Sequence, residues 1–239
     1  MLFRSYVEEF RKKHNCIVIC STFHNDILID SYPNILFVKP NTTIHNVYAQ
    51  YYIGADTTNN NLYSPVNVNH VPLQMVASST LGLTYKEIRP DLTKMVKHSK
   101  PIINQKYVTL SEFGSSDIKS WKYENGWQMV VDFLNDNGYK VVYISQEPLN
   151  DEWHDSKLGG TLKGVIDKSG DISLLDRISD LAFADYFIGV GSGLSWLAWA
   201  VGTRVMMISG FSKPFTEFTQ NCDRIFNESV CNEIGRAHV

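Results

Sequence analysis

The feature that most constrains the fold is an uncharged stretch of eighteen residues, 186–203, which glycines interrupt. That length is close to the minimum for a transmembrane helix. The stretch contains four glycines, which are Gly189, Gly191, Gly193 and Gly202. Because glycine breaks regular structure, they divide the stretch into a short apolar strand, a tight turn and a short helix. We therefore expect a buried strand–turn–helix unit and no membrane span.

Helices and strands alternate around this unit, over the C-terminal half of the chain. The predicted strands are 107–110, 140–144, 186–188 and 205–209, and the predicted helices are 126–137, 171–182 and 192–201. In the second of these helices, Ile172, Leu175 and Ile178 recur every third residue and form one apolar face. This alternation is typical of a doubly wound parallel sheet, which binds ligands beyond the carboxyl ends of its strands.

A second series of helices and strands precedes this half. The predicted helices are 6–14, 26–31 and about 72–81, and the predicted strands are 16–20, 34–38 and 47–53. The segment 86–105 is polar and contains Pro90 and Pro101, which is typical of a linker. We therefore predict an α/β protein with two domains, 6–95 and 100–232.

The charge balance argues against one large class of partner. The chain has 22 Lys and Arg residues against 25 Asp and Glu residues, a formal net charge of −3, and no block of like charge. A nucleic-acid binder needs a basic surface for phosphate contacts, so we expect no nucleic-acid partner. Four cysteines are too few for a disulfide scaffold, and no signal-peptide pattern opens the sequence. This predicts a cytoplasmic protein.

The two ends of the chain resemble foreign sequence. Residues 233–239, EIGRAHV, are the in-frame translation of a common sequencing adapter, and residues 1–5, MLFRS, translate its reverse complement. We therefore expect 1–5 and 233–239 to be adapter translation, and the remainder to be an internal fragment of a longer protein.

The glycine-rich turn after the strand 186–188 is suited to binding an anion. A turn that leads from a buried strand into a helix presents free backbone N–H groups and the positive end of the helix dipole. The alternative is a tight turn in which Ser192 serves only as the helix N-cap. The spacing fits neither a GxGxxG dinucleotide fingerprint nor a GxSxG hydrolase elbow, so neither an oxidoreductase nor a serine hydrolase is indicated.

The sequence around this turn resembles a known family. The matching motifs are GLSWLAWAVGT (193–203), MISGF (207–211), Ser212-x-Pro214-x-x-Glu217-Phe218 and Arg224-Ile225-Phe226-Asn227. Upstream motifs are Lys119-x-Trp121, Gly126-Trp127 and, more weakly, Tyr48-Ala49-x-Tyr51 and Leu81-Gly82. These motifs resemble the bacterial autotransporter O-heptosyltransferases, which are related to the lipopolysaccharide heptosyltransferases.

The resemblance implies a GT-B fold, with two Rossmann-like domains, a donor cleft between them and an incomplete N-terminal domain. It also implies an enzyme that transfers heptose from ADP-heptose to serine hydroxyls of an autotransporter passenger in the bacterial cytosol. The acceptor passenger and the nucleotide sugar are then the expected partners, and the intact protein is compatible with a homo-oligomer.

Carried over residue by residue, the family's donor site falls on Lys119, on the turn Ser192, Gly193 and Leu194, and on Glu217. A lysine after a strand's carboxyl end can neutralise a leaving diphosphate, and its alternative is a solvated surface lysine. A carboxylate at Glu217 can accept hydrogen bonds from ribose hydroxyls, and its alternative is a charge at a helix start.

Tryptophans crowd the same half of the chain. Trp121 lies in a predicted loop, and we expect it to stack on adenine or to line the heptose pocket. Trp196 and Trp199 lie three residues apart on one predicted helix, a spacing that favours core packing over ligand contact.

The family's remaining functional groups fall near the ends of this sequence. Its catalytic base belongs to a loop that precedes Tyr6, so the catalytic residue here is unknown and we expect this chain to be inactive. Its metal finger, which holds iron or zinc in the intact protein, begins with Cys-x-x-Cys, of which Cys231 is the single remnant. We therefore expect no metal in this chain. Cys16 and Cys20 are expected to be small buried residues and not ligands.

Two other functions stay open. The first is a lipopolysaccharide-type or other GT-B transferase that uses a different nucleotide sugar. The lipopolysaccharide enzymes carry Asp-Thr-Gly-Leu-x-His in this turn, and the presence of Gly191 and Trp196 here in place of the Asp and the His favours the protein-modifying branch. The second is a catalytically inactive nucleotide-binding module.

Overall fold

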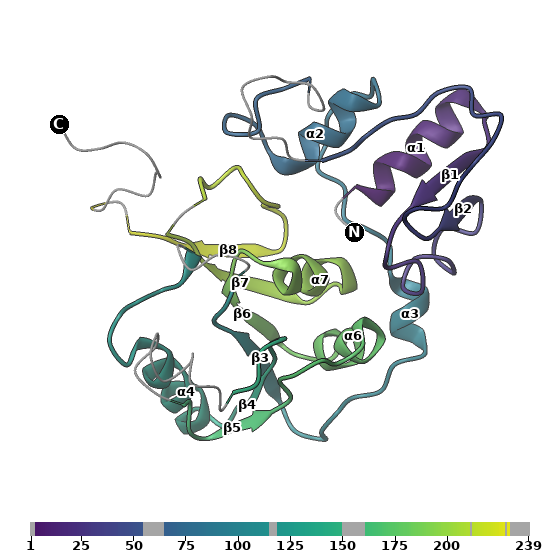
Figure 1. Cartoon of the computed structure of the whole chain (residues 1–239). Coiled ribbons are helices and arrows are strands. Elements are labelled where there is room, and N and C mark those ends of the chain that lie inside the picture. Colours follow the sequence, from purple (N-terminus) through teal and green to yellow (C-terminus); the bar gives the residue numbers. More distant parts are fainter. Residues whose placement is uncertain are drawn as a thin grey trace. The chain divides into compact units, whose positions relative to one another are not determined.

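The chain forms two compact units. The computed structural model describes residues 3–54, 65–114, 119–149, 161–210, 212–227 and 229 (Figure 1). The first unit comprises Met1–His98 together with Phe215–Gln220, and the second comprises Ser99–Pro214 together with Asn221–Val239. Sequence analysis had placed 215–220 in the C-terminal domain, whereas this segment packs with the N-terminal residues.

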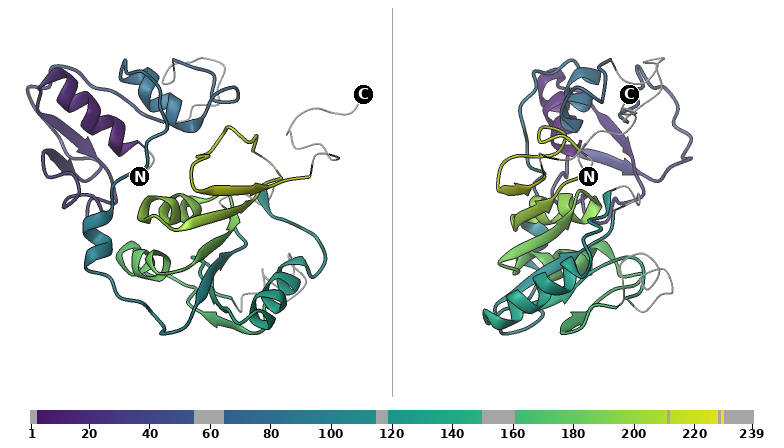
Figure 2. Two further views of the ribbon diagram at one scale, coloured as in Figure 1. Left: turned by 180° about the vertical axis from the view of Figure 1, so that it is seen from behind. Right: turned by 90° about the vertical axis from the view of Figure 1, so that its left-hand side faces the viewer.

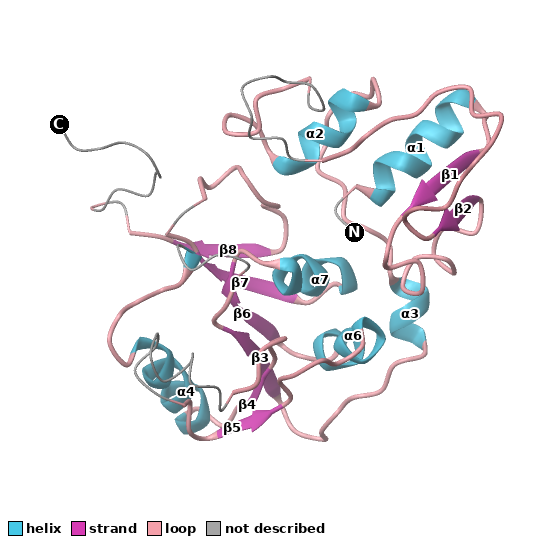
Figure 3. Cartoon of the chain, viewed as in Figure 1, coloured by secondary structure: helices cyan, strands magenta, loops and turns pink. Residues whose placement is uncertain are grey.

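The second unit is built on a six-stranded parallel sheet (Figure 3). Its strands are β3 (Tyr107–Ser111), β4 (Lys140–Tyr143), β5 (Val165–Asp167), β6 (Tyr186–Val190), β7 (Arg204–Ile208) and β8 (Cys222–Ile225). The order across the sheet is β5-β4-β3-β6-β7-β8. The chain therefore builds outward from β3 in one direction, and later returns to build outward from β6 in the other. This confirms the predicted doubly wound sheet, with its topological switch point between β3 and β6.

Helices cover both faces of this sheet. They are α4 (Gly126–Asp136), α6 (Leu174–Ala182) and α7 (Gly193–Val201). Helices α6 and α7 lie side by side, and α4 lies on the opposite side of the sheet (Figures 1 and 2). On the α4 side, Leu110, Tyr143, Trp127 and Val131 belong to one cluster of buried side chains. Because helices cover both faces of the sheet, most side chains on both sides of the inner strands β3, β4 and β6 are buried. This explains why the sequences of these strands are almost continuously apolar.

The first unit contains a smaller parallel sheet. The strands β1 (Val18–Ser21) and β2 (Ile35–Val38) pair to form this sheet. The helices of the unit are α1 (Arg4–His14), α2 (Leu73–Thr80) and α3 (Thr93–Lys97). Arg4 and Ser5, which sequence analysis assigned to the adapter translation, form the first turn of α1. Ser5 is buried, and its hydroxyl lies 3.2 Å from the Tyr32 hydroxyl.

Hydrogen bonds to backbone groups of the segment 215–220 hold it in the first unit. The Leu73 N–H donates to the Thr216 carbonyl at 2.8 Å. The carboxylate of Glu87 accepts hydrogen bonds from the backbone N–H groups of Thr219 and Gln220, each at 2.8 Å. A single acidic side chain therefore anchors residues that are more than a hundred positions away in the sequence.

Two predicted elements were wrong, and both belong to the first unit. Residues 26–31 form consecutive turns in place of a helix, and Pro33, two residues later, disfavours a helix that continues. Residues 47–53 form no strand, since side chains such as those of Val47 and Tyr48 are exposed and do not pack on a sheet. The predicted linker also contains a short helix, α3. Within the described ranges, no helix is long and apolar enough to cross a membrane.

Candidate functional site

The carboxyl ends of β3 and β6 form the centre of the candidate site. The two strands pair so that Ser111 lies opposite Gly189. A Cβ atom at position 189 would lie 2.3 Å from the Ser111 carbonyl oxygen, so only glycine allows this approach. Because the strand order reverses between β3 and β6, a ligand is expected beyond the ends of these two strands.

Strand β6 leads into α7 through Gly191 and Ser192. The Ser192 hydroxyl accepts a hydrogen bond from the Ser195 N–H at 3.4 Å, and the Ser192 N–H donates to the Ser195 hydroxyl at 3.0 Å. This capping box fixes the first turn, where the N–H groups of Gly193 and Leu194 have no acceptor within a helix. Gly193 is exposed, and a Cβ there would meet no described atom within 4 Å. Ser192 is therefore an N-cap, and the turn beyond it stays accessible to an anion.

Lys119 lies at the same turn. Its Nζ donates a hydrogen bond to the Gly191 carbonyl at 3.2 Å. A Cβ at Gly114 would lie 3.1 Å from the Lys119 Cδ and 3.4 Å from the Gly191 oxygen, so glycine at 114 leaves the lysine room to reach the turn. Lys119 follows β3 and Ser192 follows β6, and these two strands are neighbours in the sheet. The structure thus brings Lys119 to the turn that contains Ser192.

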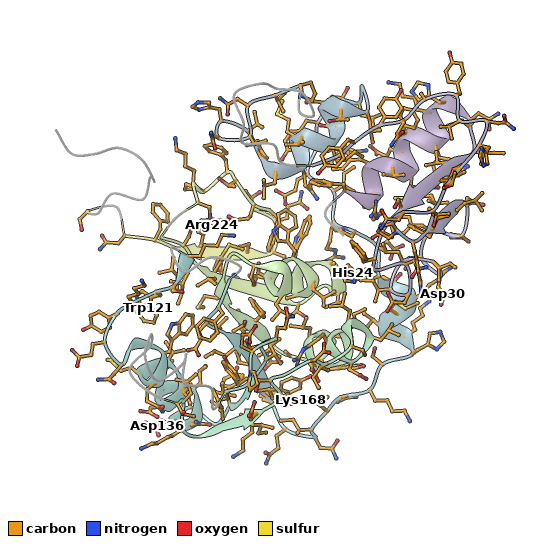
Figure 4. The ribbon with its side chains drawn as sticks, viewed as in Figure 1. His24, Asp30, Trp121, Asp136, Lys168 and Arg224 are labelled. Atoms are coloured by element: carbon orange, nitrogen blue, oxygen red, sulfur yellow. The ribbon has the colours of Figure 1, made fainter. Side chains whose placement is uncertain are left out.

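Trp121 lies in the segment that leads into α4 (Figure 4). Its ring stacks on Tyr123 at a centroid distance of 5.9 Å and meets the Trp127 ring edge-on at 5.3 Å. The half-buried ring also packs against the core cluster on the α4 side of the sheet. Its proposed contact with adenine or heptose stays a prediction. Trp196 and Trp199 are both buried, which confirms their predicted place in the core.

Two predicted site residues lie elsewhere. Glu217 is buried and belongs to the first unit, so its grouping with Lys119 stays a prediction. Cys231 lies outside the described residues. In the described part of the chain, no group of three or more His, Cys, Asp or Glu side chains is placed to hold a metal ion. Of the two N-terminal cysteines, Cys20 is buried and Cys16 is partly exposed.

A buried carboxyl group lies at the same edge of the sheet, and sequence analysis did not single it out. Glu112 directly follows β3 and is 1% exposed. The Tyr143 hydroxyl, from the end of β4, donates a hydrogen bond to its Oε1 at 3.3 Å. Burial raises the pKa of Glu112 to about 7, and the hydrogen bond from Tyr143 opposes this shift. The available signal was an acidic residue directly after a buried strand, at the edge where ligands bind.

A second buried polar network fixes the loops after β4 and β5. Arg177, in α6, donates to the carbonyl oxygens of Ser145 at 2.9 Å and Gly170 at 3.1 Å. It also pairs with Asp180, which is fully buried and contacts Lys168 as well. Sequence analysis missed this network, because charged residues on a helix more often face solvent.

The arrangement at the β3 and β6 ends combines one cation with backbone donors. Lys119 supplies an ammonium group, and the first turn of α7 supplies N–H groups and a positive dipole end. Together they can stabilise a diphosphate, in the ground state and as a leaving group.

The comparisons with known proteins agree with this geometry. Residues 66–227 match glycosyltransferase family 9 (heptosyltransferase). The chain is 34% identical to the autotransporter heptosyltransferase BAHTCr of Citrobacter rodentium, a match that covers 95% of this chain and 55% of BAHTCr. It is 29% identical to the inactive autotransporter heptosyltransferase BimC of Burkholderia thailandensis, with 95% of this chain and 53% of BimC covered.

The structure is similar to that of the dodecameric iron-containing heptosyltransferase TibC of Escherichia coli, solved in complex with ADP-D-β-D-heptose. The TM-score is 0.84 at 30% identity, covering 96% of this chain and 60% of TibC. The chain thus spans somewhat more than half the length of these relatives. The matches confirm the predicted resemblance and the GT-B class of the α/β fold. The chain therefore belongs to glycosyltransferase family 9, the heptosyltransferase family.

Proposed function

We propose that this chain carries the donor-nucleotide site of an enzyme that transfers heptose from ADP-heptose to serine hydroxyls of an autotransporter protein. The observation that carries this proposal is the placement of Lys119 on the glycine-rich turn at the topological switch point. The ADP-heptose complex of TibC supports the choice of donor. As the resemblance implies, we place the reaction in the cytoplasm.

In this reaction the serine oxygen bonds to the anomeric carbon of heptose while the bond from that carbon to the diphosphate oxygen breaks. ADP leaves with the bonding electrons, and a base takes the serine proton. Lys119 and the N–H groups of Gly193 and Leu194 would stabilise the charge that develops on the departing diphosphate. Glu217 would accept hydrogen bonds from the ribose hydroxyls, and Trp121 would contact the adenine or the heptose.

Two alternatives share this site. A different nucleotide sugar would use the same diphosphate contacts. An inactive nucleotide-binding module would bind the nucleotide without transfer, and the description of the relative BimC as inactive favours this as the second candidate. Titration of the chain with ADP-heptose and other ADP-sugars tests the first alternative. Transfer assays with the intact protein on an autotransporter passenger test the second.

We propose metal binding and oligomer formation for the intact protein only. TibC is described as iron-containing and dodecameric. The side chains in the described ranges do not form an iron or zinc site, so no step of the proposed reaction is assigned to a metal. The role of Cys231 as the remnant of a metal finger stays a prediction.

Calorimetric titration of the chain with adenosine, AMP and ADP tests the donor site. We expect affinity to increase from adenosine to AMP to ADP, because the contacts at the turn are made by the phosphates. UDP should bind more weakly than ADP if the base is recognised. Equal affinity for adenosine and ADP would contradict a diphosphate site at Lys119.

A further inference from the structure

We propose that the Glu112 carboxyl group couples binding of the donor diphosphate to uptake of a proton, so that the nucleotide sugar binds best when this carboxyl group is neutral. This inference rests on the proposed function, because it requires a diphosphate at the turn 191–194.

The backbone places Glu112 beside that turn. Glu112 directly follows Ser111, which lies opposite Gly189, two residues before Gly191. Two residues after Glu112, the Cα of Gly114 packs so closely that an added Cβ would be 3.4 Å from the Gly191 oxygen. The segment 112–114 therefore runs alongside the turn, and its acidic side chain is almost completely withdrawn from water.

Ionisable side chains from several elements lie at this end of the sheet. Tyr143 of β4 donates to its carboxylate, and Asp167 of β5 acts on Tyr143. Lys119, on the loop after β3, donates to the Gly191 carbonyl, and Arg177 of α6 donates to the carbonyl of Ser145, two residues after Tyr143. The turn residues 191–195 carry no ionisable side chain. Burial dominates this environment and raises the pKa of Glu112 to about 7.

A diphosphate at the turn adds negative charge alongside the segment that carries this buried carboxyl group. Two negative charges in a medium of low dielectric constant repel each other, so binding raises the pKa of Glu112 further. By thermodynamic linkage, protonation of Glu112 raises the affinity for the diphosphate by the same factor. The affinity should therefore fall as the pH rises above about 7.

Calorimetry with ADP-glucose tests this coupling, because the two phosphates of this ADP-sugar keep fixed charges between pH 6 and pH 8. For the full chain we expect binding about fivefold weaker at pH 8 than at pH 6, if the diphosphate raises the pKa of Glu112 by roughly one unit. In two buffers of different ionisation enthalpy at pH 7, binding should take up about 0.4 of a proton.

The variant Glu112→Gln carries a permanently neutral side chain of the same shape. We expect it to bind ADP-glucose equally at both pH values and without proton uptake. The matched control is Glu124→Gln, which changes an exposed carboxylate ahead of α4 and should behave like the unmodified chain. A Glu112→Gln variant that keeps the full pH dependence would overturn the proposal.

Tyr143→Phe provides a second, independent test. It removes the hydrogen bond that favours the Glu112 carboxylate, so the pH at which the affinity falls should move upward. A purely structural role for Tyr143 would lower stability without moving that pH, and would contradict the proposal. If neither ADP nor ADP-glucose binds at any pH, the proposed function itself fails. If they bind with an affinity independent of pH, only the role of Glu112 fails.

Discussion

Lys119 is the side chain on which the donor site most depends. Replacing it by methionine keeps the aliphatic stem and removes the charge. Since a hydrogen bond to a charged group contributes about 1.5–3 kcal/mol, we expect ADP affinity to fall by roughly 10- to 150-fold. Titration calorimetry measures this loss. Lys122→Met, an exposed change on the same loop, is the control and should leave the affinity within about twofold.

Glu112 should also affect stability in a pH-dependent way. Burial raises its pKa from 4.5 to about 7 in the folded chain, so between these values the folded state binds more protons than the unfolded state. The free energy of unfolding should therefore fall as the pH rises through this window, by up to about 3 kcal/mol. Glu112→Gln should lack this decrease, as urea unfolding at pH 4.5 and pH 8 would show. Parallel pH profiles for both proteins would refute the assignment.

At this scale the sequence predicted the residues that its local patterns determine. Ser192 could be placed from its local pattern, because it opens a helix after a glycine-rich strand. Lys119 was placed by the family resemblance, and its role stays a prediction. The position of Glu112 after a strand was visible in the sequence, but its burial and its partner Tyr143 were not, because they depend on how β3 and β4 pair, 31 residues apart. A long-range contact of this kind has no periodic signal.

The pairing of β3 with β6 depends on a single glycine. An alanine at Gly189 would place its Cβ 2.3 Å from the Ser111 carbonyl oxygen, and the strands would have to separate. We expect Gly189→Ala to destabilise the chain by several kcal/mol, on the order of the largest single-site effects. Gly193→Ala is the control, since an added Cβ there meets no described atom within 4 Å. Equal midpoints in thermal unfolding would show that β6 can shift at no cost.

The Arg177 network should contribute far more to stability than a surface ion pair. Arg177→Met would leave the buried Asp180 and three loop carbonyls without this donor, and we expect a loss of about 3–5 kcal/mol. Arg204→Met removes an exposed pair with Asp223 and should cost far less, because solvent screens such a pair. Urea unfolding of the two variants measures the difference, and similar losses would contradict a structural role for the buried network.

Elements with strong local signals were predicted, and those defined by their neighbours were not. Helix α4 has an apolar face and ends before Gly138, which adopts a left-handed φ of 82°. Strand β5 has only three residues, two of them exposed, so its identity comes from pairing with β4. The tyrosine-rich segment 47–53 has strand-forming residues but forms no strand, because it pairs with no strand of the two sheets in the described part of the chain.

At the scale of the whole chain, Glu87 links residues far apart in sequence. Glu87→Ala removes an acceptor shared by the Thr219 and Gln220 N–H groups. We expect hydrogen exchange at these two amides to accelerate by about tenfold or more, as the loss of a bond to a charged acceptor implies. Glu9→Ala serves as the control, because it breaks a surface pair with Lys86 in the same unit and leaves Glu87 in place. Unchanged exchange in Glu87→Ala would mean that other contacts hold the segment.

Neither unit is a continuous piece of the gene, because the six codons for 215–220 lie between those of β7 and β8 but encode part of the first unit. A recombination event that exchanged the C-terminal half as one cassette would import this segment with it. The hybrid would then need a residue that matches Glu87 and a backbone that matches Leu73 in the recipient half. Inheritance of the two halves is therefore linked, and chimaeras between relatives should work best when 215–220 is kept with the parent that supplies the first unit.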